Sequence, residues 1–162
     1  MKQNLEYEVE RGYKSVGEAI IGETLQRQGV DFTYEKQLLV EDQRPGDTEK
    51  ARLWYPDFSL NDLGIVIEYI GSDDQDYLKG IEKKTQTYEK MGLKVIKIYG
   101  KDVFEIGRDG KPHKRKDFEH NLLMSIYEKA RESGIRGRRT KQALLQTNII
   151  EGYLYRSGRV AA

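Results

Sequence analysis

The sequence predicts a mixed α/β fold, in which a central sheet is flanked by helices, and three observations lead to that prediction. Residues 64–70 form a short run that is apolar on both faces, as a strand covered by helices on both sides is. Segments with a helical spacing of apolar residues lie on either side of this run. Short segments of alternating apolar and polar residues lie between them. The predicted order is helix, three strands, helix, strand, helix and tail, with a mixed sheet of about four to five strands.

Helices are predicted where apolar residues recur every three or four positions and a glycine follows. These segments are residues 15–28, 76–91 and 117–133. Strands are predicted where apolar and polar residues alternate or where a short apolar run lies between turns. These segments are residues 31–40, 52–60, 64–70 and 93–99, with a further short strand at 102–106. Glycine, proline and aspartate mark turns or loops between them at 41–51 and 108–111.

The composition is that of a folded protein. The chain has 162 residues, of which 37% are hydrophobic, enough for one domain with its own core. It has no cysteine, which excludes disulfides, thiolate zinc sites and cysteine nucleophiles. The first residues are polar and acidic, and no apolar run approaches the roughly 18 residues that a membrane helix needs. We therefore expect an intracellular protein with no membrane contact, in the cytoplasm, or in the host cytoplasm if a phage encodes it.

Charge is distributed unevenly along the chain, whose formal net charge is +1. Residues 134–162 contain six basic residues and one acidic residue and carry +5, so residues 1–133 carry −4. We therefore divide the chain into a domain of residues 1–133 and a basic C-terminal tail of residues 134–162. A helix over about 140–155 is predicted in the tail, and its apolar side should pack on the domain or on a second subunit.

Two basic clusters are candidates for binding the phosphate backbone of a nucleic acid. The first lies just before the helix predicted at 117, and the second begins the tail. The candidate residues are Lys114, Arg115 and Lys116 in the first cluster and Arg136, Arg138, Arg139 and Lys141 in the second. Solubility explains either cluster equally well, and the arginine-rich start of the tail is equally consistent with a flexible tether.

Two carboxylates are the main candidates for chemistry. Asp57 stands in Tyr55-Pro56-Asp57-Phe58, and Glu68 lies within the apolar run. A lone carboxylate in such a run costs several kcal/mol to bury unless a cation or hydrogen-bond donors pair with it. At the ends of adjacent strands, the two acids offer the hard oxygen ligands that Mg²⁺ or Mn²⁺ prefers. The structural alternatives are a strand-end cap for Asp57 and a buried ion pair for Glu68.

These residues resemble the PD-(D/E)xK nuclease superfamily, which has a restriction-endonuclease-like fold. The resemblance covers about residues 15–99 and rests on Pro56-Asp57, the spacing to Glu68 and the order of the flanking elements. The local sequence is also similar to nuclease-like domains fused to some superfamily I helicases, at Tyr34-Glu35, 55–58, 67–71, Tyr77 and 84–88. The resemblance implies a restriction-endonuclease-like core and hydrolysis of phosphodiester bonds with a divalent metal, Asp57 and Glu68 being the metal ligands. It also implies products with a 5′-phosphate and a 3′-hydroxyl.

The chain departs from the superfamily pattern at its third signature residue. That residue is usually a lysine two positions after the glutamate, but this chain has Ile70 there. Lys84 is the first candidate to replace it, because it occupies a position in the 76–91 helix whose other members, from Tyr77 to Met91, are apolar or aromatic. The alternative for Lys84 is a stem that covers the edge of the core and keeps its charge in water.

Three further polar residues are candidates for the same site. Glu35 and Gln37 are two apart in the predicted 31–40 strand and would share one face, where the resemblance allows them to assist the metal or orient a water. Glu18 lies on the first helix, where many superfamily members carry an acid near the metal. Ser15-Val16-Gly17-Glu18 also matches a capping box, in which Glu18 reaches back to the backbone N–H of Ser15.

We therefore predict an Mg²⁺- or Mn²⁺-dependent DNA endonuclease. A compact nuclease without a separate recognition domain favours a structure-selective enzyme of recombination or repair, similar to Holliday junction resolvases, that acts on branched or duplex DNA as a homodimer. The alternatives are a phage or mobile-element nuclease with another DNA substrate, or a non-catalytic nucleic-acid-binding module of the same fold. A structural protein with a vestigial site is a third possibility.

Overall fold

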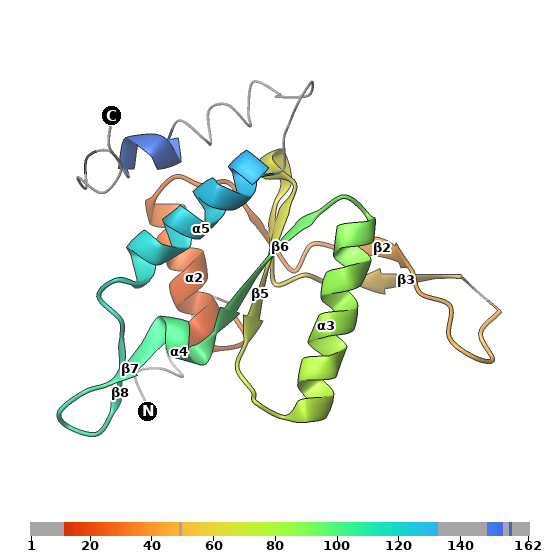
Figure 1. The fold of residues 1–162 in the computed structure, drawn as a ribbon, viewed down its shortest axis with the longest axis horizontal. Helices are drawn as coiled ribbons and strands as arrows, with labels where there is room; N and C mark the ends of the chain where they lie inside the picture. The colour runs from red at the N-terminus through yellow and green to blue at the C-terminus, as the bar shows by residue number, and fades with distance from the viewer. Residues whose placement is uncertain (1–11, 49, 133–148, 154–155, 157–162) are drawn as a thin grey trace.

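The computed structural model is a mixed α/β fold built on a four-stranded sheet with the strand order β1-β4-β5-β6 (Figure 1). It describes residues 12–48, 50–132, 149–153 and 156. The strands are β1 (Thr33–Tyr34), β4 (Phe58–Leu60), β5 (Ile65–Ile70) and β6 (Lys94–Tyr99). β1, β4 and β5 pair antiparallel, and β5 and β6 pair parallel. The predicted fold class, an α/β protein with a mixed sheet of about four strands, is confirmed.

Helices cover both faces of this sheet. They are α2 (Val16–Arg27), α3 (Gln75–Lys90), α4 (Gly100–Val103) and α5 (Phe118–Glu132). α3 connects the parallel strands β5 and β6, and Figure 1 shows it on one side of the sheet with α2 and α5 on the other. Ile65 and Ile67 of β5 therefore pack in a core with α2 and α5, whereas Val66 packs against Tyr88 of α3. This two-sided burial explains why the 64–70 run is apolar on both faces.

The two long helices that flank the candidate site begin at side-chain caps. Ser15 accepts the N–H of Glu18 at the start of α2, and Asp74 accepts the N–H of Tyr77 at the start of α3. Each helix ends before a glycine with positive φ, Gly29 at 71° and Gly92 at 83°. Because capping residues and glycines mark these ends in the sequence, the predicted boundaries agree with the structure to within about two residues.

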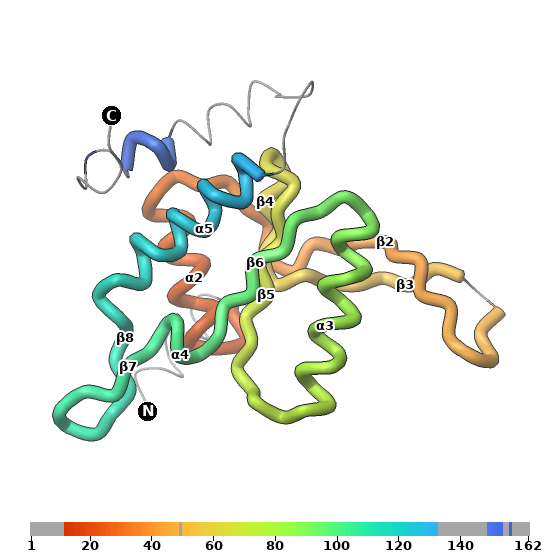
Figure 2. Tube along the Cα trace, in the orientation of Figure 1, coloured from red at the N-terminus to blue at the C-terminus, as the bar shows by residue number. Residues whose placement is uncertain are grey.

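The predicted strand at 31–40 is wrong, because the chain turns at Glu35. Glu35 has a φ of 48°, in the left-handed region, and this breaks the extended segment. Its first part is β1, and its second part is β2 (Leu38–Glu41), which pairs antiparallel with β3 (Ala51–Trp54) outside the main sheet. Figure 2 traces β2 and β3 as a hairpin that extends outward past α3.

The predicted strand at 52–60 is also divided. β3 ends at Trp54 and β4 begins at Phe58, so Tyr55, Pro56 and Asp57 lie between two different sheets. Proline has no N–H to donate to a strand partner, which is consistent with the break. Asp57 consequently stands directly before β4. The short 3₁₀ helix η1 (Asn61–Leu63) then turns the chain into β5.

The segment after β6 differs from its prediction in part. Residues 100–103 form α4 rather than the start of a strand, because the Asp102 carboxylate accepts the backbone N–H of Tyr99 at 2.8 Å and holds a helical turn there. β7 (Phe104–Ile106) follows and pairs antiparallel with β8 (Pro112–Lys114). The predicted turn at 108–111 lies between these strands.

The described part of the tail is helical at 149–153, within the predicted tail helix. Ile150 is 1% exposed and belongs to the core that contains α2 and α5, so at this residue the apolar side packs on the domain. The rest of the predicted tail helix lies outside the described residues. Among the residues that the structure describes, no helix is both long enough and apolar enough to cross a membrane.

Candidate functional site

Three of the predicted site residues, all carboxylates, lie together where α2 meets β4 and β5. Glu18 comes from the first turn of α2, Asp57 stands directly before β4, and Glu68 lies in β5. Glu18 is 6% exposed, Glu68 is 2% exposed, and Asp57 is partly buried. Asp57 is close enough to both of the other acids to change their pKa values. The structure thus brings together acids that are 39 and 11 residues apart in the chain.

Burial in this cluster makes the carboxyl groups harder to ionise. Burial, and then the neighbouring Asp57, raises the pKa of Glu68 to about 7, and the positive charge of Lys84 opposes that rise. Burial also raises the pKa of Glu18 to about 7, against a hydrogen bond from Ser15. The pKa of Asp57 is raised as well, again mainly by burial. Several carboxylates in a poorly solvated site repel one another, so a cation bound among them would be stabilised.

Asp57 is held by the backbone of the neighbouring strand. Its Oδ2 accepts the N–H of Tyr69 at 2.7 Å. The ring of Tyr69 in turn lies over Gly17 in the first turn of α2, where a Cβ atom would come within 2.2 Å of Tyr69 Cζ. Gly17 therefore permits the close approach of α2 to β5 that carries Glu18 to Asp57.

Glu68 faces α3. Its Oε1 accepts a hydrogen bond from the Tyr88 hydroxyl at 3.1 Å, and its Oε2 lies 3.9 Å from Nζ of Lys84. Tyr88 is fully buried and packs edge-on against Trp54 of β3, with ring centroids 5.7 Å apart. The Lys84 side chain is 38% exposed, so its charge lies between solvent and the buried acid. Lys84 therefore lies on the side of α3 that faces β5, and Glu68 has the ion-pair partner that its burial required.

Of the two hydrogen bonds in the capping box predicted at the start of α2, one forms as expected and the other has a different donor. The Ser15 hydroxyl accepts the Glu18 N–H at 3.1 Å, as expected. However, the Glu18 carboxylate accepts a hydrogen bond from the Ser15 hydroxyl at 2.9 Å instead of from the Ser15 backbone N–H. Glu18 therefore points inward toward Asp57 while it stays bonded to the cap.

Glu35 and Gln37 do not share the face of a strand, which corrects the prediction for this pair. Both lie in the turn between β1 and β2 that the left-handed Glu35 creates. Glu35 forms an ion pair with Lys14, and its backbone N–H donates to the carbonyl oxygen of Asp57 at 3.0 Å. Glu35 thus lies at the edge of the site, whereas Gln37 is exposed.

An open cavity of about 550 Å³ gives access to this site. It is lined by Lys14, Glu35, Leu53, Trp54, Tyr55, Asp57 and Lys84. Sequence reasoning missed Lys14 as a lining residue, although its place directly before the Ser15 cap puts it at the same end of α2 as Glu18. It also missed the hairpin residues Leu53 and Trp54, because their position depends on how β3 folds over α3.

The predicted basic clusters lie elsewhere or outside the described residues. Lys114 and Lys116 are exposed, and Arg115 pairs with Asp117 at 3.0 Å. Figure 1 shows the β7–β8 hairpin, which contains Lys114, on the opposite side of the molecule from the β2–β3 hairpin that borders the cavity. The other four candidates, Arg136, Arg138, Arg139 and Lys141, are not among the described residues.

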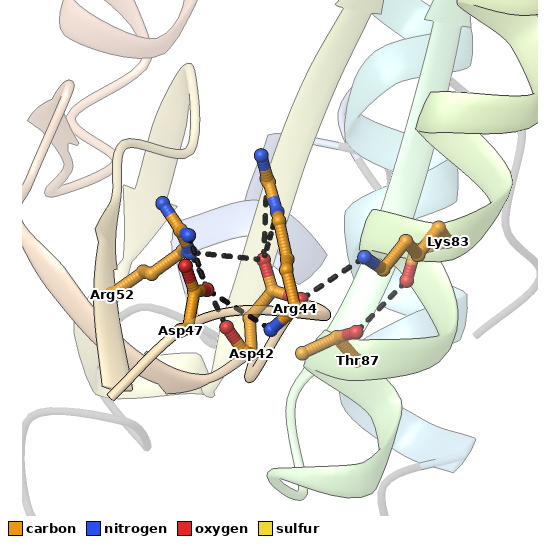
Figure 3. Close-up of polar contacts among 6 residues, drawn as sticks. All are labelled: Asp42, Arg44, Asp47, Arg52, Lys83 and Thr87. Atoms are coloured by element: carbon orange, nitrogen blue, oxygen red, sulfur yellow. Dashed lines mark hydrogen bonds and ion pairs between the residues drawn. The ribbon is translucent and has the colours of Figure 1, made fainter. Parts of the chain in front are cut away.

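A polar cluster that the sequence did not predict fastens the β2–β3 hairpin to α3 (Figure 3). Its centre is Asp42, whose side chain is 6% exposed. Asp42 accepts hydrogen bonds from Lys83 at 3.0 Å and from Arg44 at 3.3 Å, and Arg52 lies 3.9 Å away and also pairs with Asp47. Lys83 and the neighbouring cations lower the pKa of Asp42. Because Lys83 precedes Lys84 on α3, this cluster sets the hairpin beside the candidate site.

The donor atoms of the site suit a hard divalent cation, because they are carboxylate oxygens in a region of excess negative charge. Asp57 and Glu68 are the residues that would hold such an ion. Within the part of the chain that the structure describes, however, no set of three or more histidine, cysteine, aspartate or glutamate side chains is arranged to hold a metal ion. Two protein carboxylates completed by water and substrate phosphate are a usual arrangement for Mg²⁺.

Comparison with known proteins adds nothing to this geometry. No protein-family model, curated protein or solved structure matches the chain.

Proposed function

We propose that this chain is a divalent-metal-dependent DNA endonuclease that hydrolyses phosphodiester bonds. The observation that carries the proposal is the cluster of Asp57 and Glu68 with Lys84, whose Nζ lies 3.9 Å from Glu68 Oε2, beside an open cavity. Buried acids with raised pKa values and a lysine in one cleft are typical of catalytic sites. An acid pair for a hard cation together with a nearby positive charge is the chemistry that phosphodiester hydrolysis requires.

The order of the elements supports a restriction-endonuclease-like core. Apart from the inserted β2–β3 hairpin and η1, the chain order is a first helix, an antiparallel set of strands, a crossover helix and a parallel strand, namely α2, β1, β4, β5, α3 and β6. This arrangement brings the acid of the first helix, the acid before β4 and the acid in β5 together, as the resemblance to PD-(D/E)xK nucleases implies. Ile70, at the usual lysine position, is 2% exposed and supplies no charge.

In this proposal each residue of the site has a separate task. Asp57 and Glu68 hold the metal, and Glu18 adds negative charge beside Asp57. Bound Mg²⁺ or Mn²⁺ would neutralise a phosphate oxygen and lower the pKa of water. Lys84, approaching from α3, would stabilise the negative charge that develops on the phosphate, in place of the absent strand lysine. Metal binding requires ionised carboxylates, so activity should rise as the pH passes about 7, the raised pKa of Glu68 and Glu18.

The finer proposal is selectivity for branched DNA, as in Holliday junction resolvases. A homodimer would place two such sites about a two-fold axis and cut both strands of a four-way junction symmetrically. The same chemistry would serve a phage or mobile-element nuclease that acts on another DNA substrate.

The test is cleavage of a four-way junction beside linear duplex, single-stranded and flapped DNA, with Mg²⁺ or Mn²⁺. We expect Asp57→Asn and Glu68→Gln to abolish cleavage and Lys84→Ala to reduce it at least about 100-fold, a typical effect for one electrostatic group at a reacting centre. Lys79→Ala is the matched control, because Lys79 is an exposed lysine of the same helix. Absence of cleavage of every substrate with both metals would overturn the proposal.

A second candidate function is a nucleic-acid-binding module without catalysis. It is favoured by the pairing of Lys84 with Glu68 and by the absence, among the described residues, of a group of three metal ligands. In that case Lys84 serves only to neutralise a buried acid. Binding of DNA without cleavage, unchanged by Asp57→Asn, would support this module over the enzyme.

A further inference from the structure

Asp57 is held from both neighbouring strands of the sheet. On the β5 side, its Oδ2 accepts the N–H of Tyr69 at 2.7 Å. On the β1 side, its carbonyl oxygen accepts the N–H of Glu35 at 3.0 Å. The ladder between β1 and β4 pairs Tyr34 with Phe58, so the bond from Glu35 continues this ladder by one residue. Asp57 is therefore fixed both through its carboxylate and through its backbone.

The residue on the β1 side has an unfavourable backbone conformation. Among the residues that the structure describes, Glu35 is the one residue other than glycine with a positive φ, at 48°. In this left-handed region a Cβ atom comes too close to the following carbonyl oxygen, whereas glycine adopts the same conformation freely. Strained backbone that surrounding contacts maintain is found mainly at functional sites.

The side chain of Glu35 connects the same turn to α2. Its carboxylate forms an ion pair with Lys14. The backbone N–H of Lys14 also donates to the Tyr34 hydroxyl at 3.1 Å, so both residues at the end of β1 contact Lys14. Lys14 lies just before the first turn of α2, which carries Glu18. The turn at Glu35 thus contacts the two segments that carry Glu18 and Asp57.

This ion pair does not account for the strained conformation. The pKa of Lys14 is raised mainly by its hydrogen bond to Glu35 and further by the charges of Glu18 and Asp57, so its ammonium group lies near all three acids. However, the Lys14 side chain is 69% exposed. A pair this exposed stabilises a fold only slightly, by less than a left-handed side chain costs. Stability alone therefore favours glycine at position 35.

We propose that Glu35 is a positioning residue, which holds Asp57 in the orientation that metal binding requires and keeps Glu18 beside it. Its left-handed backbone directs its N–H at Asp57, and its carboxylate holds the start of α2 through Lys14. Glu35 acts through these neighbours and is not itself a metal ligand. This inference rests on the proposed nuclease function, because it gives Glu35 a role in the same site.

Substitutions separate the backbone role of Glu35 from the role of its carboxylate. Glycine adopts the left-handed turn but has no carboxylate, whereas the β-branched valine does not fit the turn. We therefore expect Glu35→Val to release Asp57, and Glu35→Gly to keep the N–H bond and lose only the pair with Lys14. The Tm of Glu35→Gly should be no lower than that of wild type, because glycine relieves the strain. Glu105→Val is the control, because Glu105 is exposed in the extended strand β7, where valine fits.

The first measurement reports the position of Asp57 without metal or DNA. The amide of Tyr69 donates to the Asp57 carboxylate, so its hydrogen exchange depends on that contact. Exchange is followed by NMR of the full-length chain in EDTA. We expect it to be about tenfold faster in Glu35→Val, the effect of losing one hydrogen bond to a charged group, and unchanged in Glu35→Gly. Ile67, which pairs with Phe58 in the ladder, is the internal reference.

The second measurement is the Kd for Mn²⁺ alone, from calorimetric titration at pH 8. We expect Glu35→Val to raise this Kd by about 10–100-fold, as loss of a residue that orients a metal ligand does. Glu35→Gly should raise it less, and Glu105→Val should leave it unchanged. Thermal melting identifies any loss of folding, and Glu35→Thr, which is β-branched and polar, replaces a Glu35→Val variant that does not fold.

Three results would overturn the inference. The first is Tyr69 exchange in Glu35→Val equal to that of wild type, and the second is an equal Kd for Mn²⁺ in these two proteins. The third is a Glu35→Gly variant that binds Mn²⁺ as weakly as Glu35→Val while its Tyr69 exchange is unchanged, which would identify the Glu35 carboxylate as a metal ligand.

The two proposals fail separately. Tyr69 exchange and Mn²⁺ binding that respond to Glu35→Val, with no cleavage of DNA by wild type, would leave the positioning role and remove the nuclease. Cleavage by wild type, with Tyr69 exchange and the Kd unaffected by Glu35→Val, would leave the nuclease and remove the positioning role.

Discussion

The hydroxyl of Tyr88 donates a hydrogen bond to Oε1 of Glu68 at 3.1 Å, and the two residues are only 0% and 2% exposed. The bond joins α3 to β5 in the interior, one helical turn from Lys84, which approaches the other oxygen of the same carboxylate. It therefore fixes both the orientation of Glu68 and the distance at which α3 presents its lysine. This hydrogen bond therefore connects the buried core residue Tyr88 to the candidate site.

Replacing Tyr88 by phenylalanine should remove this bond and leave the ring packing in place. We expect the free energy of unfolding to fall by about 1–3 kcal/mol, because a buried carboxylate loses a donor that water cannot replace. Urea unfolding at pH 8 measures the loss. Tyr127→Phe is the matched control, because its hydroxyl bonds Glu151 at the surface. A loss no larger than in this control would show that solvent reaches Glu68.

The stability of the metal-free chain should fall as the pH rises from about 4.5 to 7. Burial raises the pKa of Glu68 from 4.5 to about 7, so in this window the folded state keeps a proton that the unfolded state releases. Below this window Glu68 does not lower the free energy of unfolding. Above it, the ionised carboxylate lowers the free energy of unfolding by up to about 3 kcal/mol. Carboxylates whose pKa is lowered, such as Asp47 and Asp117, change stability only at lower pH.

Comparison with Glu68→Gln isolates this effect. The variant should show a smaller decline in Tm between pH 5 and pH 8 than wild type, both measured in EDTA. If Asp57 and Glu68 bind a metal, Mg²⁺ should raise the Tm of wild type at pH 8 and not at pH 5, and should leave the variant nearly unchanged. An equal decline in Tm with pH for the two proteins would show that the pKa of Glu68 is not raised.

Gly17→Ala should disturb the site through packing. A Cβ atom at this position would lie 2.2 Å from Tyr69 Cζ, so either the ring or α2 must move. We expect a loss of about 1–3 kcal/mol on unfolding, as for other overpacked positions. Gly80→Ala is the control, because a Cβ atom there meets nothing within 4 Å. Equal stability of the two variants would mean that Tyr69 moves aside freely.

Asp42→Asn should loosen the β2–β3 hairpin from α3. It removes the charge that Lys83, Arg44 and Arg52 share, while the shape of the side chain is kept. We expect faster amide hydrogen exchange in β2 and β3 and a shift in the fluorescence of Trp54, with exchange in β5 unchanged. Asp109→Asn, which breaks an exposed pair with His113, should change neither. Exchange rates in the hairpin equal to wild type would show that strand pairing alone holds it.

The helices were predictable because their signals are local. Ser15 and Asp74 cap α2 and α3, and glycines follow both, so neighbouring residues in the sequence define the ends. β5 was predictable for a similar reason, since burial on both faces leaves a run of apolar residues. The strand break at Glu35 was not, because a left-handed glutamate leaves no compositional mark and is held by its N–H bond to the Asp57 carbonyl.

The α/β class, the long helices, the apolar β5 and the carboxylate inside it were all predictable from the sequence, because each depends on periodicity or on the cost of burying a charge. The groups that meet Glu68 and Asp57 were not predictable in this way, because they come together only in the folded chain. Tyr88 and Lys84 reach Glu68 through the docking of α3, and Glu18 reaches Asp57 through the close approach allowed at Gly17. Contacts between distant segments depend on packing across the sheet, and side-chain periodicity along one segment does not contain that information.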